Sequence, residues 1–346
     1  MIKLLIVEDS ALMRRQLASI FEAEGDFEIR FARNGAEAVE ANKVFLPDVI
    51  TMDINMPEMD GLTALSILMV ERPVAVVMVS SLTEKGALAT FEALALGAID
   101  YVTKPGGTIS LSIEVIKQEM VDKVRAAARA KLKFNKIRST FKPLEREKTP
   151  VRRSAETEGI VIIGVSTGGP RTLEDVLPLL PENLPWPVLV AQHMPANFTP
   201  HFAERMNKMC ALNVVEANSP MRLEPGTIYI GKGGADMVVA RRSGKLAVIA
   251  KPESANHIWH PSVELLGRSV LENCDMSKVI AVMLTGMGND GSNAFTEIHK
   301  KGGRTIAESE ASCVVFGMPA QLIKLGGATV VLDANKIAKQ ISAWSR

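Results

Sequence analysis

Short apolar runs separated by amphipathic stretches make up the first 120 or so residues of the chain. The runs are brief and almost wholly apolar, which is typical of strands buried on both faces. They cover residues 3–7, 27–32, 49–52, 75–79 and 100–102. Helical periodicity fills the gaps at residues 11–24, 36–43, 62–71 and 86–96. Gly25 suits the end of the first helix. This repeated β-α alternation predicts a parallel, doubly wound sheet of the flavodoxin-like (βα)5 type.

The alternation restarts at Gly159. Further strands are expected at residues 159–165, 188–191, 213–217, 279–284, 304–307 and 329–332. Helices are expected at residues 171–180, 201–208, 262–273, 294–301 and 334–344. Residues 236–241 and 245–249 flank the turn sequence RSG and predict a β-hairpin. The second domain is therefore also predicted to be α/β, a Rossmann-like doubly wound sheet that carries a β-hairpin.

The segment between the two alternations is strongly basic. From Arg125 to Arg153 it holds eleven Lys or Arg against two Asp or Glu, and residues 142–158 lack any core-forming period. We interpret residues 126–158 as a linker between domains at 1–125 and 159–346. A basic run can instead bind nucleic acid, but no helix-turn-helix pattern lies beside this one, so we expect no nucleic-acid partner.

Composition places the chain among ordinary globular proteins. Forty Lys and Arg against 39 Asp and Glu give a net charge of +1, which favours neither nucleic acid nor membrane. Cys210, Cys274 and Cys313 are widely spaced and odd in number, so reduced thiols fit better than a disulfide framework. The first apolar run leads straight into Glu8 and Asp9, unlike a signal peptide. We expect a soluble, cytoplasmic protein without direct membrane insertion.

Polar residues follow several of the strands predicted in the first domain. Glu8 and Asp9 follow the first strand, Asp53 the third, Ser80 the fourth and Lys104 the fifth. The carboxyl ends of the strands in such a sheet line one crevice. Three carboxylates there suit Mg²⁺, and a lysine and a hydroxyl suit a transferring phosphoryl group. For a single Asp, an ordinary strand-end polar residue would be the better interpretation; the convergence of four strand ends favours a site.

This pattern resembles the response-regulator receiver family. The resemblance spans about residues 1–120 and rests on four motifs: VEDS at 7–10, MDINMPEMDG at 52–61, VSS at 79–81 and DYVTKP at 100–105. It implies that Asp53 accepts a phosphoryl group from a histidine kinase, with Mg²⁺ held by Glu8, Asp9 and Asp53. It further implies that Lys104 contacts the phosphoryl group.

The same resemblance implies that Ser80 and Tyr101 form the conformational switch of the receiver. A simple core or edge aromatic remains the alternative for Tyr101, and the sequence does not separate the two.

The second domain opens with a candidate nucleophile. The sequence GVSTGGP at residues 164–170 follows an apolar strand, precedes a helix and matches the G-x-S-x-G pattern around Ser166. Free N–H groups at the start of a helix can stabilise an oxyanion. A phosphate-binding turn uses the same geometry, but the chain has neither GxGxxG nor GxxxxGK[ST], which weakens a nucleotide-binding interpretation.

A serine nucleophile needs a base, and the chain has five histidines. His193 directly follows a predicted strand, whereas His201 and His299 look like helix-surface residues. His257 and His260 form an H-x-x-H pair beside Trp259. As metal ligands they lack a convincing third partner, so we expect them to line a groove or to pack.

The base in turn needs a carboxylate to orient it. Asp290 again lies just past a predicted strand. Its alternative role is to cap the helix that follows. The order Ser…His…Asp differs from the Ser…Asp…His order of α/β-hydrolases, which indicates a separate origin.

The second domain closely resembles the chemotaxis protein-glutamate methylesterase (CheB) family, and the receiver-linker-catalytic order matches end to end. The motifs that carry the resemblance are IIGVSTGGP at 162–170, AQHMP at 191–195, LTGMGNDG at 284–291 and SCVVFGMP at 312–319. The resemblance implies that Ser166 is the nucleophile, His193 the base and Asp290 the orienting carboxylate. It places the oxyanion hole at the N–H groups of Thr167 and Met287, and it implies no cofactor for the esterase site.

The resemblance also implies what the protein does. The enzyme would hydrolyse glutamate methyl esters, and deamidate glutamines, on methyl-accepting chemotaxis receptors, giving chemotactic adaptation. An unphosphorylated receiver would inhibit it until a chemotaxis histidine kinase donates phosphate. Two rivals stay open: a receiver that drives a nucleotide- or nucleic-acid-binding output domain, and a scaffold.

Cys313 is a further possible nucleophile on paper, but a buried thiol is the better interpretation.

Overall fold

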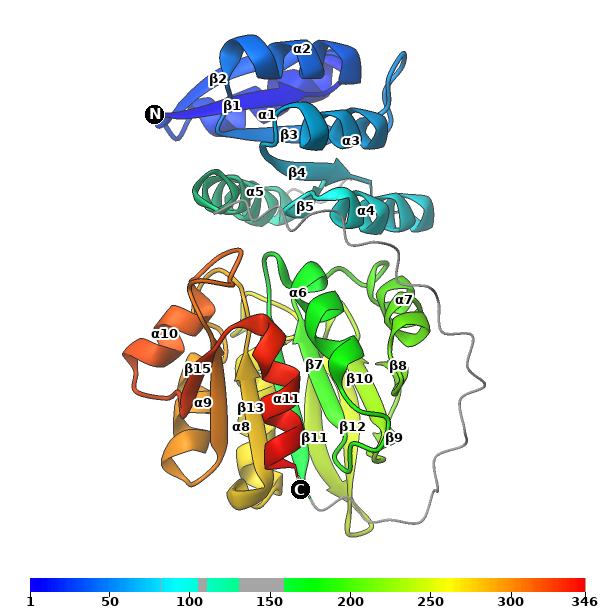
Figure 1. The fold of residues 1–346 in the computed structure, drawn as a ribbon, viewed down its shortest axis with the longest axis vertical. Helices are drawn as coiled ribbons and strands as arrows, with labels where there is room; N and C mark the ends of the chain where they lie inside the picture. Colours follow the sequence, from blue (N-terminus) through cyan, green and yellow to red (C-terminus); the bar gives the residue numbers. More distant parts are fainter. Residues whose placement is uncertain (82, 105–110, 131–158, 346) are drawn as a thin grey trace. The chain divides into compact units, whose positions relative to one another are not determined.

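The computed structural model describes the chain except residues 82, 105–110, 131–158 and 346. The chain divides into two compact units, residues 1–135 and 136–346 (Figure 1). None of the helices in the described part has both the length and the apolar composition that crossing a bilayer requires.

The first unit is a five-stranded parallel sheet with the strand order β2-β1-β3-β4-β5. The strands are β1 (Ile2–Val7), β2 (Phe27–Ala32), β3 (Val49–Asp53), β4 (Ala75–Ser80) and β5 (Asp100–Thr103). The helices are α1 (Ala11–Glu22), α2 (Gly35–Phe45), α3 (Gly61–Glu71), α4 (Glu84–Leu96) and α5 (Leu111–Arg129). Helices α2, α3 and α4 pack in series, and α1 packs with α5. The predicted flavodoxin-like fold is confirmed.

A side-chain cap starts each of the first four helices. The caps are Ser10, Asn34, Asp60 and Thr83, and each accepts a hydrogen bond from a backbone N–H three residues later. Such a cap satisfies one of the N–H groups that a helix leaves unpaired at its start. The caps thus fix where each of these helices begins.

The second unit has a seven-stranded parallel sheet with the order β15-β14-β13-β6-β7-β10-β8. Its strands are β6 (Ile160–Val165), β7 (Val188–Gln192), β8 (Asn213–Ala217), β10 (Thr227–Gly231), β13 (Val279–Met283), β14 (Arg304–Glu308) and β15 (Val330–Leu332). Its helices are α6 (Gly169–Val176), α7 (Thr199–Met209), α8 (Val263–Asn273), α9 (Ser292–Lys300), α10 (Met318–Lys324) and α11 (Ala334–Trp344), with 3-10 turns η1 (Leu177–Leu179) and η2 (Met276–Lys278). Every residue of β6, β7 and β13 is buried.

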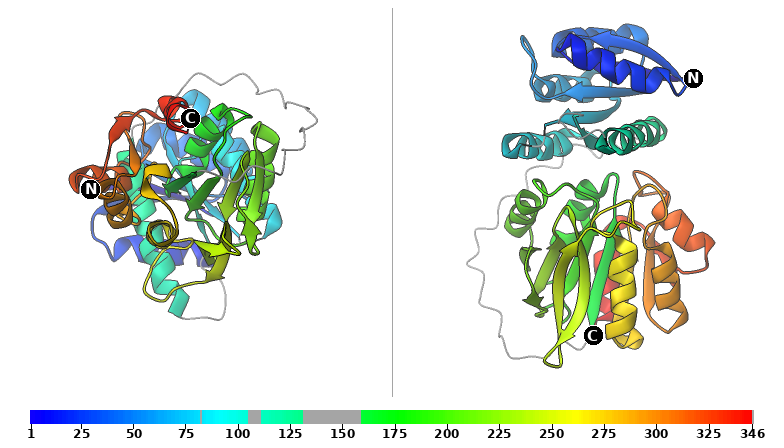
Figure 2. Two further views of the ribbon diagram at one scale, coloured as in Figure 1. Left: turned by 90° about the horizontal axis from the view of Figure 1, so that it is seen from below. Right: turned by 180° about the vertical axis from the view of Figure 1, so that it is seen from behind.

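A smaller antiparallel sheet contains the predicted hairpin. It has the order β11-β12-β9, formed by β11 (Ala235–Arg242), β12 (Lys245–Pro252) and β9 (Met221–Arg222). Its strand β11 packs against α8, as the view from behind shows (Figure 2). The predicted hairpin is therefore present and longer than expected.

Several elements differ from the sequence-based expectation. Strand β10 was not predicted: its five residues lie between turn sequences and are too short for a clear period, yet they are fully buried between β7 and β8. Helix α10 was also not predicted, because it has only seven residues, the second of which is Pro319. Helix α5 continues past residue 125 to Arg129, and residues 131–158 of the expected linker lie outside the described residues.

Candidate active site

The topology brings three strand ends together in the second unit. Strand β6 lies between β13 and β7, so the winding of the sheet changes direction beside β6. Ser166 follows β6 directly, His193 follows β7, and Asp290 follows β13 after a short loop. Ligand sites of open α/β sheets lie at such a reversal, outside the carboxyl ends of the strands.

The three side chains form one hydrogen-bonded chain. Nδ1 of His193 lies 3.0 Å from Oγ of Ser166, and Nε2 lies 2.9 Å from Oδ2 of Asp290. The imidazole thus faces the serine with Nδ1 and the carboxylate with Nε2, the reverse of the pairing in the serine-protease triad. When Nε2–H donates to Asp290, the Nδ1 lone pair is available to accept the serine proton.

Close backbone packing shapes the turn that carries Ser166. The Ser166 N–H donates to the Thr285 carbonyl at 3.0 Å, and the Gly169 N–H donates to the Ser166 carbonyl at 2.8 Å. Gly168 has φ +74°, which disfavours a side chain, and a Cβ on Gly169 would lie 2.0 Å from Oε1 of Gln192. The backbone of the turn therefore favours glycine at position 168, and the close approach of Gln192 favours it at position 169.

Gln192 ties the nucleophile to the base. Its side-chain Nε2 donates to the carbonyl oxygens of both Ser166 and His193, at 3.1 and 3.0 Å. Only 2% of Gln192 is exposed, so these bonds are shielded from water. Sequence reasoning missed this residue, although its position between the strand and His193 was visible in AQHMP.

Asp290 lies at the start of helix α8. Its carboxylate accepts hydrogen bonds from the backbone N–H groups of Val263 and Glu264, at 2.7 and 2.9 Å, and from the Ser262 hydroxyl at 3.1 Å. Burial by itself raises the pKa of Asp290. The hydrogen bond and charge of His193, together with the two backbone N–H groups, outweigh burial and lower that pKa. Asp290 therefore stays an anion beside the base.

The alternative role of Asp290 as a helix cap is only half right. The helix after it, α9, has Gly291 at its N-cap position and no side-chain cap. Asp290 instead satisfies N–H groups of α8, a helix that precedes it in the chain. The sequence could not indicate this contact, since it depends on how α8 packs.

The residues predicted for the oxyanion hole flank the nucleophile. Thr167 follows it directly, and Met287 follows Gly286, where a Cβ would lie 2.8 Å from the Ser166 Cβ. Neither the Thr167 nor the Met287 backbone N–H donates to another residue in the described part of the chain. Both remain available to a ligand, and their role stays a prediction.

The two histidines of the H-x-x-H pair have other partners. Nδ1 of His260 lies 2.8 Å from Oδ1 of Asp236, and Nδ1 of His257 lies 3.4 Å from Oγ of Ser262. Among the described residues, one group of three His, Cys, Asp or Glu side chains lies close enough together to share a metal ion. That group is in the first unit. The H-x-x-H pair contacts Asp236 and Ser262, in keeping with a packing role, and Cys313 is buried as expected.

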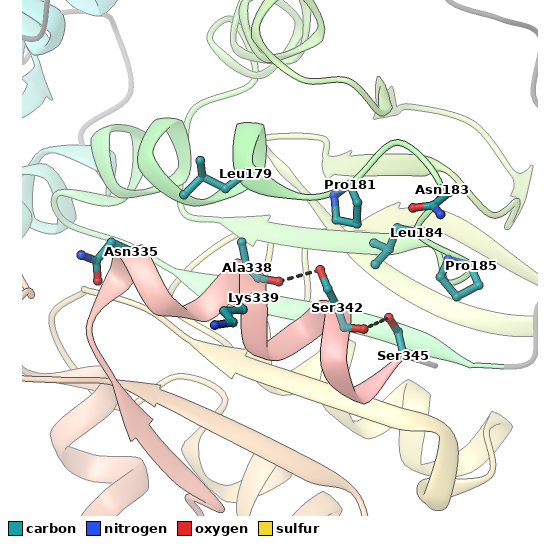
Figure 3. Close-up of a pocket in the computed structure, with 10 residues that line it drawn as sticks. All are labelled: Leu179, Pro181, Asn183, Leu184, Pro185, Asn335, Ala338, Lys339, Ser342 and Ser345. Carbon is teal, nitrogen blue, oxygen red and sulfur yellow. Dashed lines mark hydrogen bonds between the residues drawn. The ribbon is translucent and has the colours of Figure 1, made fainter.

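A separate hollow of about 530 Å³ lies between residues 179–185 and helix α11 (Figure 3). The Ser342 hydroxyl donates to the Ala338 carbonyl and the Ser345 hydroxyl to the Ser342 carbonyl, at 2.8 and 3.4 Å. Their donors are thus committed to the helix backbone. No residue of the triad lines this hollow.

The acidic residues of the first unit also converge. Carboxylate oxygens of Glu8, Asp9 and Asp53 lie within 4.8 Å of one another. Nζ of Lys104 lies 2.7 Å from Oδ2 of Asp53 and 3.1 Å from Oε2 of Glu8. As in the second unit, the strands involved lie at the reversal of the sheet, because β1 is flanked by β2 and β3.

Electrostatics in this cluster favour a cation. Burial, followed by the negative charge of Asp53, raises the pKa of Glu8, and Lys104 only partly offsets this. Burial lowers the pKa of Lys104, but Asp53 and Glu8 outweigh it and raise that pKa. Oε2 of Glu8 is buried, and the Lys104 ammonium is its partner at 3.1 Å. A compact set of hard, buried oxygen donors fits Mg²⁺.

The Ser80 hydroxyl and the Tyr101 ring have partners outside the acidic cluster. The Ser80 hydroxyl donates to the Ser81 and Gly86 carbonyls, both at 3.3 Å. Tyr101 is 3% exposed, and Nζ of Lys123 lies 5.1 Å from the centre of its ring. Their role as a switch stays a prediction.

Known proteins resemble both units. The CheB methylesterase profile matches residues 161–341, and the response regulator receiver domain profile matches residues 4–116. A protein-glutamate methylesterase/protein-glutamine glutaminase of Rhodospirillum rubrum is 52% identical, covering 99% of this chain and 96% of its own. One of Caldanaerobacter subterraneus is 47% identical, covering 100% and 98%. The crystal structure of the Thermotoga maritima CheB methylesterase catalytic domain has a TM-score of 0.52 and 39% identity, covering 54% of this chain and 97% of that one.

Proposed function

The chain belongs to the CheB methylesterase family, and from this premise we propose that it is a phosphorylation-controlled serine hydrolase of methyl-accepting chemotaxis receptors. It hydrolyses glutamate methyl esters and deamidates glutamines, the two activities in the names of its relatives. The observation that carries the proposal is the unbroken hydrogen-bonded chain from Ser166 through His193 to Asp290. Nothing favours a nucleotide- or nucleic-acid-binding output domain. The cytoplasmic location expected from the sequence stays a prediction.

In the proposed mechanism, Oγ of Ser166 attacks the γ-carbonyl carbon of the glutamate ester while its proton passes to Nδ1 of His193. Asp290 stabilises the imidazolium through Nε2–H. The tetrahedral intermediate collapses, the methoxide oxygen takes the proton from Nδ1, and methanol leaves. Water then attacks the acyl-enzyme, again with His193 as base, and releases the glutamate carboxylate. For a glutamine substrate the leaving group is ammonia.

The negative charge of each tetrahedral intermediate needs stabilisation. We assign this to the backbone N–H groups of Thr167 and Met287, which make no hydrogen bond to other described residues. Gly286 supports the assignment, because its close approach to Ser166 keeps the Met287 loop beside the nucleophile.

Control of the activity is proposed to act through the first unit. Asp53 attacks the phosphoryl group carried by a chemotaxis histidine kinase, and Lys104 neutralises the charge of the group received. Glu8, Asp9 and Asp53 would hold Mg²⁺, which supplies further charge neutralisation when bound. Phosphorylated Asp53 relieves inhibition of the esterase, with Ser80 and Tyr101 as the switch.

Replacing the nucleophile tests the proposal. Ser166→Ala should lower methanol release from methylated receptors by about a thousandfold or more, because the covalent route is lost. Ser342→Ala is the matched control, since that hydroxyl only donates within its own helix. Methanol release near the wild-type rate in Ser166→Ala would reject the assignment.

A further inference from the structure

A tryptophan in one loop lies beside the triad. The Trp259 loop (residues 253–262) connects β12 to α8 and contains the H-x-x-H pair of the sequence. Its Trp259 ring is stacked on the His193 imidazole, with ring centres 5.7 Å apart and planes 6° apart. The neighbouring Ile258 is 72% exposed, so the loop turns only one of its two large apolar side chains toward the base.

A single buried carboxylate holds both ends of the Trp259 loop. Asp236, which is 1% exposed, accepts hydrogen bonds from the backbone N–H groups of Ser254 and Ser262, both at 2.9 Å. Its Oδ1 also lies 2.8 Å from Nδ1 of His260, the residue next to Trp259. Bonds to a charged and buried acceptor are among the stronger ones in proteins. The position of Trp259 is thus fixed from both sides.

The indole also touches the loop on the other side of the base. A Cβ on Gly288 would lie 3.0 Å from Cη2 of Trp259, so the ring rests on the backbone between Met287 and Asp290. Trp259 therefore lies against both the imidazole and the loop that carries its orienting carboxylate. Such a contact limits rotation of the imidazole away from the line joining Ser166 and Asp290.

We propose that Trp259 is a positioning residue for the esterase reaction, acting through His193. The indole face keeps the imidazole in line with the nucleophile and attracts the imidazolium that forms in the transition state. The 5.7 Å separation lies within the range over which a cation is attracted to an aromatic face. The Asp236–His260 pair has the supporting task of holding the loop. The inference rests on the proposed triad.

The test is the rate at which a fluorophosphonate inactivates the full-length chain, separated into the maximal rate and the apparent affinity for the probe. Stacked aromatic pairs are worth enough that Trp259→Leu should slow the maximal rate by about threefold to tenfold with the affinity unchanged. Trp259→Phe keeps a ring face and should stay within about twofold of wild type. Ile258→Ala, the exposed neighbour, should match wild type.

The outcomes separate the possibilities. An unchanged maximal rate in Trp259→Leu overturns the inference, and so does a Trp259→Phe variant as slow as Trp259→Leu. Should Trp259→Leu fail to fold, Asp236→Asn replaces it: an amide cannot accept all three hydrogen bonds, so the same slowing is expected, and a wild-type rate again overturns the inference. Labelling that persists in Ser166→Ala would instead refute the proposed function itself.

Discussion

At the scale of single residues, the site depends on a carboxylate that stays ionised although it is buried. The pKa of Asp290 is below its ordinary value of 3.8, because His193 and two backbone N–H groups outweigh desolvation. A group whose pKa is lowered on folding stabilises the fold above its unfolded pKa. That contribution is lost as the pH falls through the lower, folded value.

The lowered pKa of Asp290 leads to a prediction for acid unfolding. Relative to Asp290→Asn, the wild-type protein should lose its stability advantage as the pH falls below the ordinary Asp pKa of 3.8 and through the lower, folded pKa, where the carboxylate becomes protonated. Unfolding midpoints of the two proteins, measured side by side, check this, and the other carboxyl groups largely cancel in the difference. An advantage that stays constant or grows on acidification over this interval would contradict the origin we give for the lowered pKa.

At the scale of elements, helix α3 starts very close to the phosphoacceptor strand. A Cβ on Gly61 would lie 2.1 Å from the carbonyl oxygen of Asp53, which is backbone and cannot move aside. We expect Gly61→Ala to destabilise the first unit by about 1–3 kcal/mol and to slow phosphorylation of Asp53. Gly25→Ala is the matched control: its φ of +71° strains a side chain, but no atom lies within 4 Å.

Chemical unfolding and phosphorylation by acetyl phosphate check this prediction together. Both variants should lose some stability, but only Gly61→Ala should lose phosphorylation rate. Equal phosphorylation of Gly61→Ala and wild type would show that the start of α3 does not constrain Asp53.

The elements also differ in how well the sequence predicts them. Buried parallel strands have a strong apolar signal, so the strands that carry Ser166, His193 and Asp53 were predictable to within about a residue. Strand β10 was not, because five residues between turns have no distinct period. The contacts of Trp259, Gln192 and Asp236 depend on packing between distant segments, so the sequence gives residue types there but no partners.

At the scale of the whole molecule, the proposal couples two sites on two sheets. Both lie where the winding of a parallel sheet reverses, β1 beside β3 in one unit and β6 beside β13 in the other. The order of the two units in the chain matches relatives along nearly its full length. A covalent change at Asp53 is therefore expected to alter the rate at Ser166.

Within the motif MDINMPEMDG at residues 52–61, Asp53 should be the one carboxylate needed for activation of the esterase by phosphorylation. Acetyl phosphate and Mg²⁺ should raise methanol release by the wild-type, full-length protein and leave Asp53→Asn unchanged. Asp60→Asn is the control, because Asn also caps a helix and Asp60 only caps α3. Equal activation of Asp53→Asn and wild type would place the phosphoacceptor elsewhere.

The most direct test of the account is to find which atom becomes covalently modified during attack. The full-length protein is treated with a serine-directed fluorophosphonate, digested and mapped by mass spectrometry, beside a His193→Ala variant. The account predicts one adduct, on Ser166, formed far more slowly without His193. An adduct on another residue, or labelling of Ser166 that is indifferent to His193, would contradict it.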